Sequence, residues 1–298
     1  MFGKTVKKKI VTIPFVSRCV QAIRLLLTLN ICLTTIKIFR LSSLRCLKKH
    51  RRWIALKYAG NYLGRSFSCR CRGAILINHY GFINKYLPKG FAETLITSKV
   101  VLWEKLLGVN LYTVTLQFPY YDMEGDIAVQ FNVNGFGISI VSFTIINGNM
   151  VGIDSEQVIL IARVQGTKWK FDLIRQATKD LNEVTPNTLL VIAVQAIATA
   201  LKIESIAGVA TKEHIDLDDF HYNYDELWIS MGGDKVNKHV FHLPTAPHNK
   251  PMAMVKVNHR CRTKQKRQFK VDVYNQIILA FEQKCLNLSQ LDNFQHLT

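Results

Sequence analysis

The chain has 298 residues, of which 48% are hydrophobic and 20% are charged. That is enough apolar material for a folded core, so the composition excludes disordered, collagen-like and coiled-coil proteins. Lysine and arginine number 39 against 21 acidic residues, which gives a net charge of +18. The excess is concentrated, because residues 1–72 contain 17 basic side chains and no acid.

Cysteine usage and the apolar runs indicate the compartment. The seven cysteines are an odd number scattered along a long chain, which favours a reducing, cytoplasmic environment over a disulfide framework. The longest apolar run near the start covers residues 25–36 and ends at Lys37, short of the ~20 residues that a membrane-spanning helix needs. A cleaved export signal is the weaker interpretation, since Pro14, Arg18 and Arg24 interrupt its apolar part.

The first region, residues 1–72, is predicted to be basic and helical. From Phe15 to Leu47, apolar residues recur at steps of three and four with basic residues between them. Such a stretch either lies on an anionic membrane or packs on the main domain with its basic face in water. Its run 48–52 of basic residues before Trp53 could also seek nucleic-acid phosphates, although no recognised motif surrounds it.

Residues 73–298 are predicted to form an α/β domain, which begins with a helix and a meander of strands. Residues 95–107 have a helical pattern closed by Gly108, and residues 109–118 alternate as a strand does. Residues 126–133 and 136–146 flank Asn134–Gly135, the pair best suited to a two-residue hairpin turn. A second turn at Asn147–Gly148 leads to an apolar strand over residues 157–165.

The second half of the domain alternates helices with short strands. We expect helices over residues 169–181 and 187–201, the latter opened by Pro186, then a strand over 205–210. A helix over 218–231, a strand over 239–243 and a closing helix over 264–286 complete the order. The fold class is therefore α/β (α+β), with a twisted, mainly antiparallel sheet flanked by helices.

From about Tyr121 to Phe281 the sequence resembles the VirK/YbjX family of Gram-negative bacterial proteins, which is defined by a domain of unknown function. The residues that carry the resemblance are Glu124–Gly125, Ser142–Phe143, Val164–Gln165–Gly166, Arg175, Lys179, residues 186–198, Gly208–Val209, His214, Tyr224–Asp225, Trp228, Gly232–Gly233, Leu243–Pro244 and the basic stretch 260–267. The resemblance implies an envelope-associated factor linked to virulence, stress response and resistance to antimicrobial peptides, without an agreed reaction.

The order of the predicted elements is also similar to that of the GCN5-related N-acetyltransferases. In those enzymes, backbone N–H groups after the central strand hold the pyrophosphate of acyl-CoA at a helix N-terminus. The resemblance places this role on Gln165, Gly166 and Thr167, although the loop here reads Gln-Gly-Thr-Lys-Trp and is not glycine-rich. Acyl-CoA is thus the one cofactor that the sequence suggests.

Acyl transfer to an amine needs a general base for the amine and an acid for the departing thiolate. The candidate bases are His214, Asp218 and Glu124, and the candidate acids are Tyr222 and Tyr224. Each has an ordinary structural interpretation beside the catalytic one. His214 would be a hydrogen-bonded turn residue, Asp218 a helix-start residue and Tyr224 a core residue.

Two further patterns concern anions and metals. Arg260, Arg262, Lys264 and Arg267 could grip phosphate or lipid headgroups, or simply form the solvated start of a helix. Cysteines 69 and 71 lack a second pair at zinc spacing, so no metal site is predicted.

The functions that remain belong to three classes. The first is an envelope-associated stress and virulence factor with acyltransferase-like activity, peripheral on the inner membrane. The second is a non-catalytic protein that binds anionic lipid or a partner, and the third is a nucleic-acid-binding stress protein. The sequence assigns no oligomeric state.

Overall fold

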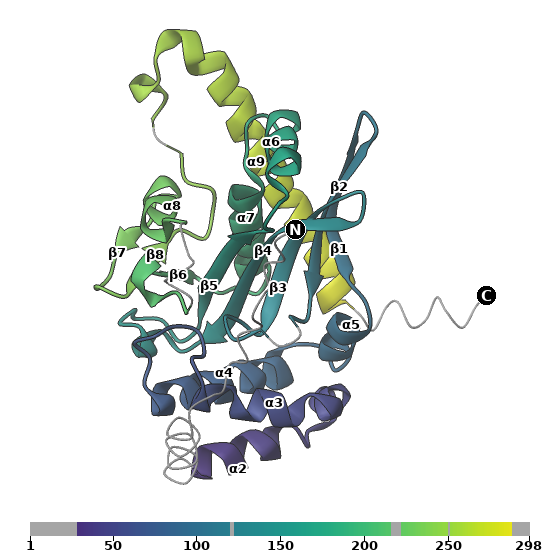
Figure 1. Ribbon diagram of the computed structural model, residues 1–298, viewed down its shortest axis with the longest axis vertical. Coiled ribbons are helices and arrows are strands. Elements are labelled where there is room, and N and C mark those ends of the chain that lie inside the picture. Colours follow the sequence, from purple (N-terminus) through teal and green to yellow (C-terminus); the bar gives the residue numbers. More distant parts are fainter. Residues whose placement is uncertain (1–28, 120–121, 216–221, 250, 288–298) are drawn as a thin grey trace, which may run out of the picture.

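The computed structural model describes residues 29–119, 122–215, 222–249 and 251–287, and in this part of the chain one sheet of eight strands forms the centre (Figure 1). The strand order is β1-β2-β3-β4-β5-β6-β8-β7, and every neighbouring pair is antiparallel except β5 with β6. This confirms the predicted α/β class with a mainly antiparallel sheet. The strands are β1 (Val100–Leu107), β2 (Asn110–Gln117), β3 (Ile127–Val133), β4 (Phe136–Ile146), β5 (Val158–Gly166), β6 (Ser205–Val209), β7 (Asp234–Lys235) and β8 (Val240–Leu243).

The hairpin between β3 and β4 is the one that the sequence predicted. Asn134 and Gly135 both have positive φ, at 51° and 82°, as a type I′ turn requires. Asparagine and glycine tolerate this left-handed conformation at little cost, so the turn fixes the register of β3 against β4.

The prediction of a helix over residues 95–107 is wrong. The helix α5 (Phe91–Thr97) lies earlier, and β1 occupies most of the predicted range. Gly108 has a φ of 59° and makes a turn back into β2, so Leu107 pairs with Asn110 and Val100 pairs with Leu116. Cross-strand pairing outweighs the helical propensity of a stretch rich in leucine, glutamate and lysine.

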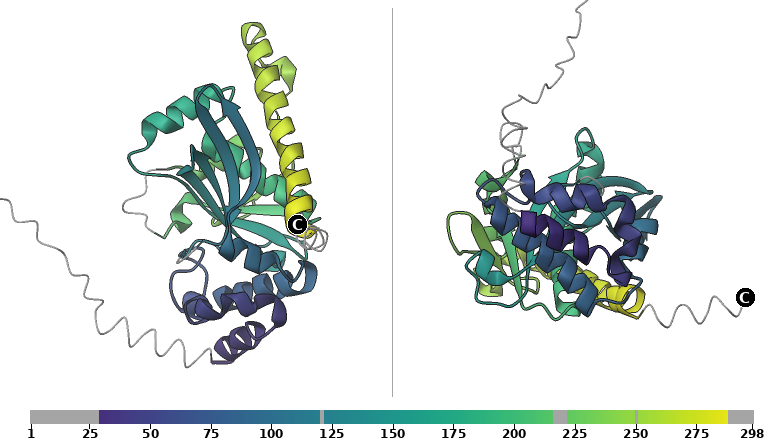
Figure 2. Two further views of the ribbon diagram at one scale, coloured as in Figure 1. Left: turned by 90° about the vertical axis from the view of Figure 1, so that its right-hand side faces the viewer. Right: turned by 90° about the horizontal axis from the view of Figure 1, so that it is seen from below.

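Helices α7 (Pro186–Ala200) and α9 (Arg260–Phe281) pack against each other and cover one face of the sheet (Figures 1 and 2). Pro186 stands in the first turn of α7 and Thr185 caps it by accepting from the N–H of Thr188. The short helix α6 (Phe171–Asp180) precedes α7, and the hydroxyl of Tyr112 on β2 donates to Asp180 at 2.5 Å. This face is therefore closed to solvent along most of the sheet.

A layer of helices lies at the end of the sheet where α5 leads into β1 (Figure 1). We call it the N-terminal layer, and it consists of α2 (Leu29–Ile38), the 3-10 helix η1 (Ser42–Lys49), α3 (Arg51–Leu56), the 3-10 helix η2 (Lys57–Ala59), α4 (Cys69–Tyr86) and α5. Leu44, Ile54 and Tyr58 are fully buried and belong to the same core cluster as the strands. The described part of the basic region thus packs on the sheet, while the domain boundary after residue 72 stays a prediction.

A buried ion pair joins this layer to the sheet. The Lys57 ammonium donates to a carboxylate oxygen of Asp126 at 2.8 Å and to the carbonyl of Gly125 at 2.7 Å. The Asp126 carboxylate also accepts from Tyr62, Tyr80 and Thr144. Burial alone would raise the pKa of Asp126, but the Lys57 ammonium, helped by His79 and by the Tyr62 hydroxyl, lowers that pKa to about 2.

Strands β5 and β6 part halfway along β5. Ile161 pairs with Gly208, but residues 162–166 of β5 have no partner on β6. The register between β4 and β5 shifts at Ser142 and Phe143, so that Ala162 is an extra residue in β5. Such a β-bulge bends a strand and re-aims the side chains beyond it. The bulge and the parting of the strands coincide, and they create an opening between β5 and β6.

The side chains of α8 (Tyr224–Ser230) fill this opening from one side. Trp228 is fully buried and donates from its indole N–H to the carbonyl of Val209 at 2.8 Å. A Cβ on Gly208 would lie 2.5 Å from the Trp228 ring, so only glycine lets the indole lie flat on β6. Helix α8 is shorter than the predicted helix over 218–231, and residues 216–221 lie outside the described ranges.

The remaining predicted elements agree closely with the structure. The strand expected over 157–165 is β5, the helix over 187–201 is α7, and the closing helix begins at Arg260, four residues earlier than expected. Of the helical stretch predicted over residues 15–47, the structure describes the part from Leu29 onward. This part forms α2, which ends at Ile38, and the 3-10 helix η1 that follows it. None of the helices described is both long and apolar enough to cross a bilayer.

Candidate functional site

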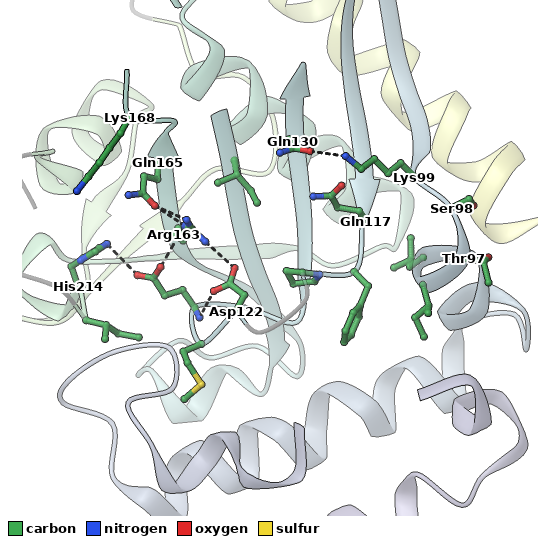
Figure 3. A pocket seen from close by; sticks show the side chains of 18 residues that line it. Thr97, Ser98, Lys99, Gln117, Asp122, Gln130, Arg163, Gln165, Lys168 and His214 are labelled. Atoms are coloured by element: carbon green, nitrogen blue, oxygen red, sulfur yellow. Dashed lines mark hydrogen bonds and ion pairs between the residues drawn. The ribbon is translucent and has the colours of Figure 1, made fainter. Parts of the chain in front are cut away.

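The face of the sheet opposite α7 carries a pocket of about 990 Å³ (Figure 3). Its floor comes from adjacent strands, because Gln130 of β3 pairs with Ile140 of β4, and Ile140 pairs with Gln165 of β5. Directly paired residues project from the same face of a sheet, so these three side chains form one row. Part of the wall comes from residues 95–99, which are the end of α5 and the two residues between α5 and β1. The floor is polar, unlike the apolar interior behind it.

Arg163 is the centre of the charge network in this pocket (Figure 3). Its guanidinium lies 3.4 Å from the Asp122 carboxylate and 3.5 Å from the Glu124 carboxylate. It also donates twice to the side-chain oxygen of Gln165, at 2.9 and 2.6 Å. Asp122 is anchored in turn by the hydroxyl of Ser142, which donates at 2.6 Å. The bulge at Ala162 directly precedes Arg163 and sets where its side chain points.

Glu124 and His214 form the second part of the site. Nε2 of His214 lies 3.1 Å from a carboxylate oxygen of Glu124, and both side chains are largely buried at the edge of the pocket. The loop that carries Glu124 presses against β4, since a Cβ on Gly125 would lie 2.7 Å from the amide nitrogen of Phe143. A carboxylate beside an imidazole is an arrangement that can hold and move a proton.

Tyr224 connects the pocket with the opening between β5 and β6. Its hydroxyl accepts from the backbone N–H of Val164 at 2.8 Å, beyond the point where β5 leaves β6. Its ring lies 5.8 Å from that of His214, in an edge-on arrangement. Burial raises the pKa of Tyr224, so this phenol keeps its proton at neutral pH.

Three of the five residues predicted for catalysis, Glu124, His214 and Tyr224, therefore lie together. A fourth, Tyr222, is exposed, and its ring lies 6.0 Å from that of Tyr224. The fifth, Asp218, lies outside the described residues. Tyr224 is also a core residue, as its structural interpretation predicted, because it is fully buried and its ring packs against Trp228.

The residues predicted to hold acyl-CoA are placed differently from one another. Gln165 lines the pocket through its side chain, and Gly166 is the last residue of β5, paired with Ser139. The N–H of Thr167 is already donated to the carbonyl of Ile138 at 2.8 Å. Of the three, Gln165 is the one whose polar groups face the pocket.

The residues predicted to bind anions lie on the first turns of α9, away from the pocket. Arg262 pairs with Glu183 at 2.9 Å, and Arg260 donates to the carbonyl of Val255 at 3.1 Å. Lys264 is exposed, and Arg267 is half-buried. Within the described ranges, no group of three or more metal-ligating side chains is arranged around a common centre.

Sequence reasoning missed Arg163, Asp122 and Ser142. The signal for Arg163 was present, because a lone arginine interrupts the apolar run 158–164, whose other residues are all buried. No local pattern could reveal Asp122 and Ser142, since they come from a loop and from β4 and meet only through the register of the sheet.

Comparison with known proteins gives one family. A model of a family described as proteins of unknown function (DUF535) matches residues 15–278, which is most of the chain. The comparisons found no curated protein and no solved structure that matches. The match spans the sheet, the pocket and nearly all of α9. The chain belongs to the DUF535 family of proteins of unknown function.

Proposed function

We propose that this protein is an acyltransferase that takes an acyl thioester at the opening between β5 and β6. The observation that carries the proposal is the bulged, unpaired end of β5, where the Val164 N–H and the Tyr224 hydroxyl meet beside the Glu124–His214 pair. The order of elements, a long hairpin, a central strand, an apolar helix, a parallel strand and a helix, also matches the order expected from the resemblance to acetyltransferases.

Glu124 in the pocket and the buried Tyr224 beside it are the two proton-handling groups that the reaction needs. An acceptor amine or hydroxyl in the pocket would give its proton to Glu124, whose carboxylate is positioned by Arg163 and His214. The acceptor then forms a bond to the acyl carbon as the carbon–sulfur bond breaks. The thiolate that leaves takes a proton from the Tyr224 hydroxyl, and the proton that Glu124 accepted then returns to the Tyr224 oxygen, so that both groups regain their starting state. The products are an acylated acceptor and a free thiol.

The basic groups at the end of the pocket would hold the anionic part of the thioester. Lys168 lines the pocket on the Gln165 side, and Arg163 lies on its floor. Arginine and lysine are the side chains that bind phosphate oxygens most strongly. This support is independent of the glycine-rich loop that the sequence lacks.

We also propose that the protein acts at the cell envelope, as a stress- and virulence-associated factor. The support is the set of residues shared with the VirK/YbjX proteins and the concentration of basic residues at the start of the chain and in residues 256–270. An acyltransferase in that place would act on an amine or hydroxyl of an envelope component.

The test is release of free thiol from acetyl-CoA and from a long-chain acyl-CoA, with a mixture of bacterial envelope lipids as acceptor. Glu124→Gln keeps the shape and removes the base, so we expect turnover to fall by about 10²–10⁴-fold with little change in thioester binding. Glu226→Gln, an exposed residue of α8, is the matched control and should leave the rate unchanged. Equal rates in Glu124→Gln and the wild type would contradict the assigned role.

A further inference from the structure

Three turns lie at the end of the sheet opposite the N-terminal layer (Figure 1), and they carry large apolar side chains that are exposed. Val109 is 91% exposed and Trp169 is 88% exposed, and the other apolar members are more than 60% exposed. Soluble surfaces carry single exposed apolar residues, but a group at neighbouring turns indicates a binding surface. We call this group the tip surface, and it comprises Leu106, Val109, Phe136, Lys168, Trp169, Lys170 and Phe171.

Hydrogen bonds join the three turns into one row. Leu111, just after the β1–β2 turn, donates to the side chain of Asn134 at 2.8 Å and accepts from the Asn134 N–H at 2.8 Å. Thr167, just after β5, donates from its hydroxyl to the carbonyl of Gly137 at 3.3 Å. The three turns that carry the tip surface therefore lie side by side at one end of the strands.

The backbone at Trp169 is unusual for an aromatic residue. Its φ is 68°, in the left-handed region that residues with a large side chain rarely adopt. The indole is exposed and so gains little from packing in return. Strain that the fold itself does not use is typical of a functional position.

Positive charge surrounds these apolar side chains. Lys168 and Lys170 flank Trp169, and Lys105 lies on β1 near its turn. The basic first turns of α9 extend beyond the sheet at this same end of the molecule (Figures 1 and 2). Of the nearby acids, Glu183 pairs with Arg262 at 2.9 Å, and the exposed Asp172 has Arg175 3.8 Å away.

We infer that the tip surface docks onto the anionic leaflet of a lipid bilayer. The apolar side chains would enter the interface, where tryptophan is favoured, and the lysines would meet lipid phosphates. The exposed side chains at these turns are aliphatic as well as aromatic, which favours the hydrocarbon of a membrane as the ligand. A nucleic-acid site would instead present aromatic rings that stack on bases, together with cations. This inference does not require acyl transfer, and it differs from a membrane contact through residues 1–72.

Vesicles of phosphatidylglycerol and phosphatidylcholine test the surface with the full chain. Brominated lipids should quench Trp169, because Trp103 and Trp228 are buried and Trp53 is half-buried. Trp169→Gly relieves the positive φ while removing the indole, so we expect about tenfold weaker binding without loss of the fold. Lys168→Gln with Lys170→Gln should weaken binding about 30-fold, since each lysine near an anionic surface contributes about fivefold.

The matched controls replace an exposed apolar residue and a pair of exposed lysines that lie outside the tip surface. Ile229→Ser removes a 62% exposed side chain of α8, and Lys49→Gln with Lys48→Gln removes two charges of the N-terminal layer. Both should bind vesicles as the wild type does. The inference is overturned if the Lys48 and Lys49 pair abolishes binding while the tip variants do not. It is equally overturned if the protein does not bind the vesicles and instead binds duplex DNA with an affinity that falls steeply as salt is raised.

Discussion

Lys57 is the residue through which the N-terminal layer is held electrostatically to the sheet. Its ammonium and the Asp126 carboxylate are each about 1% exposed, so neither charge is solvated by water. Removing one partner of such a pair leaves the other charge buried and unpaired. We expect Lys57→Met to lower the free energy of unfolding by about 3–5 kcal/mol.

Urea denaturation measures this change, and Lys49→Met provides the matched control. Lys49 is exposed in η1, so its replacement should alter stability by no more than about 0.5 kcal/mol. A loss below about 1 kcal/mol in Lys57→Met would mean that Asp126 finds a substitute partner, contrary to the account above.

His79 predicts how stability depends on pH. Burial of its imidazole, with the Lys57 ammonium nearby, lowers the pKa of His79 from 6.5 to about 4, and Nδ1 accepts from the N–H of Ile145. The unfolded chain therefore binds a proton that the folded chain excludes. The resulting stabilisation is fully present above about pH 6.5 and is lost as pH falls to about 4, for a total of about 3 kcal/mol.

The comparison that isolates this residue is His79→Gln against His242→Gln, an exposed histidine of β8. Denaturation between pH 7 and pH 4.5 should show a shallower loss in His79→Gln and the wild-type slope in His242→Gln. Identical slopes in all three proteins would place the titrating group elsewhere.

Residues of the site differ in how far the sequence could reveal them. Glu124, His214 and Tyr224 were candidates because they carry the family resemblance and have side chains that can act as a base or an acid. Arg163 acquires its role from a β-bulge, and the loop residue Asp122 acquires its role from the Ser142 hydroxyl on β4. Both roles depend on the register in which the strands pair, and this register cannot be read from the sequence.

At the scale of elements, the packing of α8 on β6 decides the shape of the opening. Gly208 lies under the Trp228 ring, where any Cβ would be 2.5 Å from the indole. We expect Gly208→Ala to displace Trp228 and with it α8, and to cost about 1–3 kcal/mol of stability. Tryptophan fluorescence reports the displacement of Trp228, and urea denaturation reports the loss of stability.

Gly81, in the middle of α4, is the matched control for that substitution. A Cβ there would meet no atom within 4 Å, so Gly81→Ala should be neutral or should stabilise the helix by up to about 1 kcal/mol. If the two variants behave alike, the close contact with Trp228 does not shape the opening.

The elements themselves were predictable to different degrees. The Asn134–Gly135 hairpin and the Pro186 helix carry local signals, a turn pair and a helix-opening proline, and the structure confirms both. Strand β1 was predicted as a helix, because its extended form depends on pairing with β2 after the Gly108 turn. The parting of β5 from β6 has no local signal, since it follows from where α8 packs.

At the scale of the whole molecule, the pocket lies between two basic ends. The N-terminal layer exposes Arg45, Lys48, Lys49 and Arg52, and the opposite end carries the tip surface and the first turns of α9. The polar floor of the sheet joins them, with Lys168 belonging both to the pocket and to the tip surface. An acceptor from a membrane held at the tip surface would therefore reach the pocket at its Lys168 end.

The central claim is that the opening beside Gln165 binds an acyl thioester, and calorimetric titration with acetyl-CoA and a long-chain acyl-CoA tests it most directly. At about 100 μM protein, a ligand of ~10 μM affinity, or roughly −7 kcal/mol, gives a clear heat. Gln165→Glu keeps the side-chain shape but sets a negative charge against the thioester's diphosphate, so binding should weaken by about tenfold. Gln268→Glu, exposed on α9, should bind as the wild type does. The absence of heat with both thioesters, or equal binding by Gln165→Glu, would contradict the account.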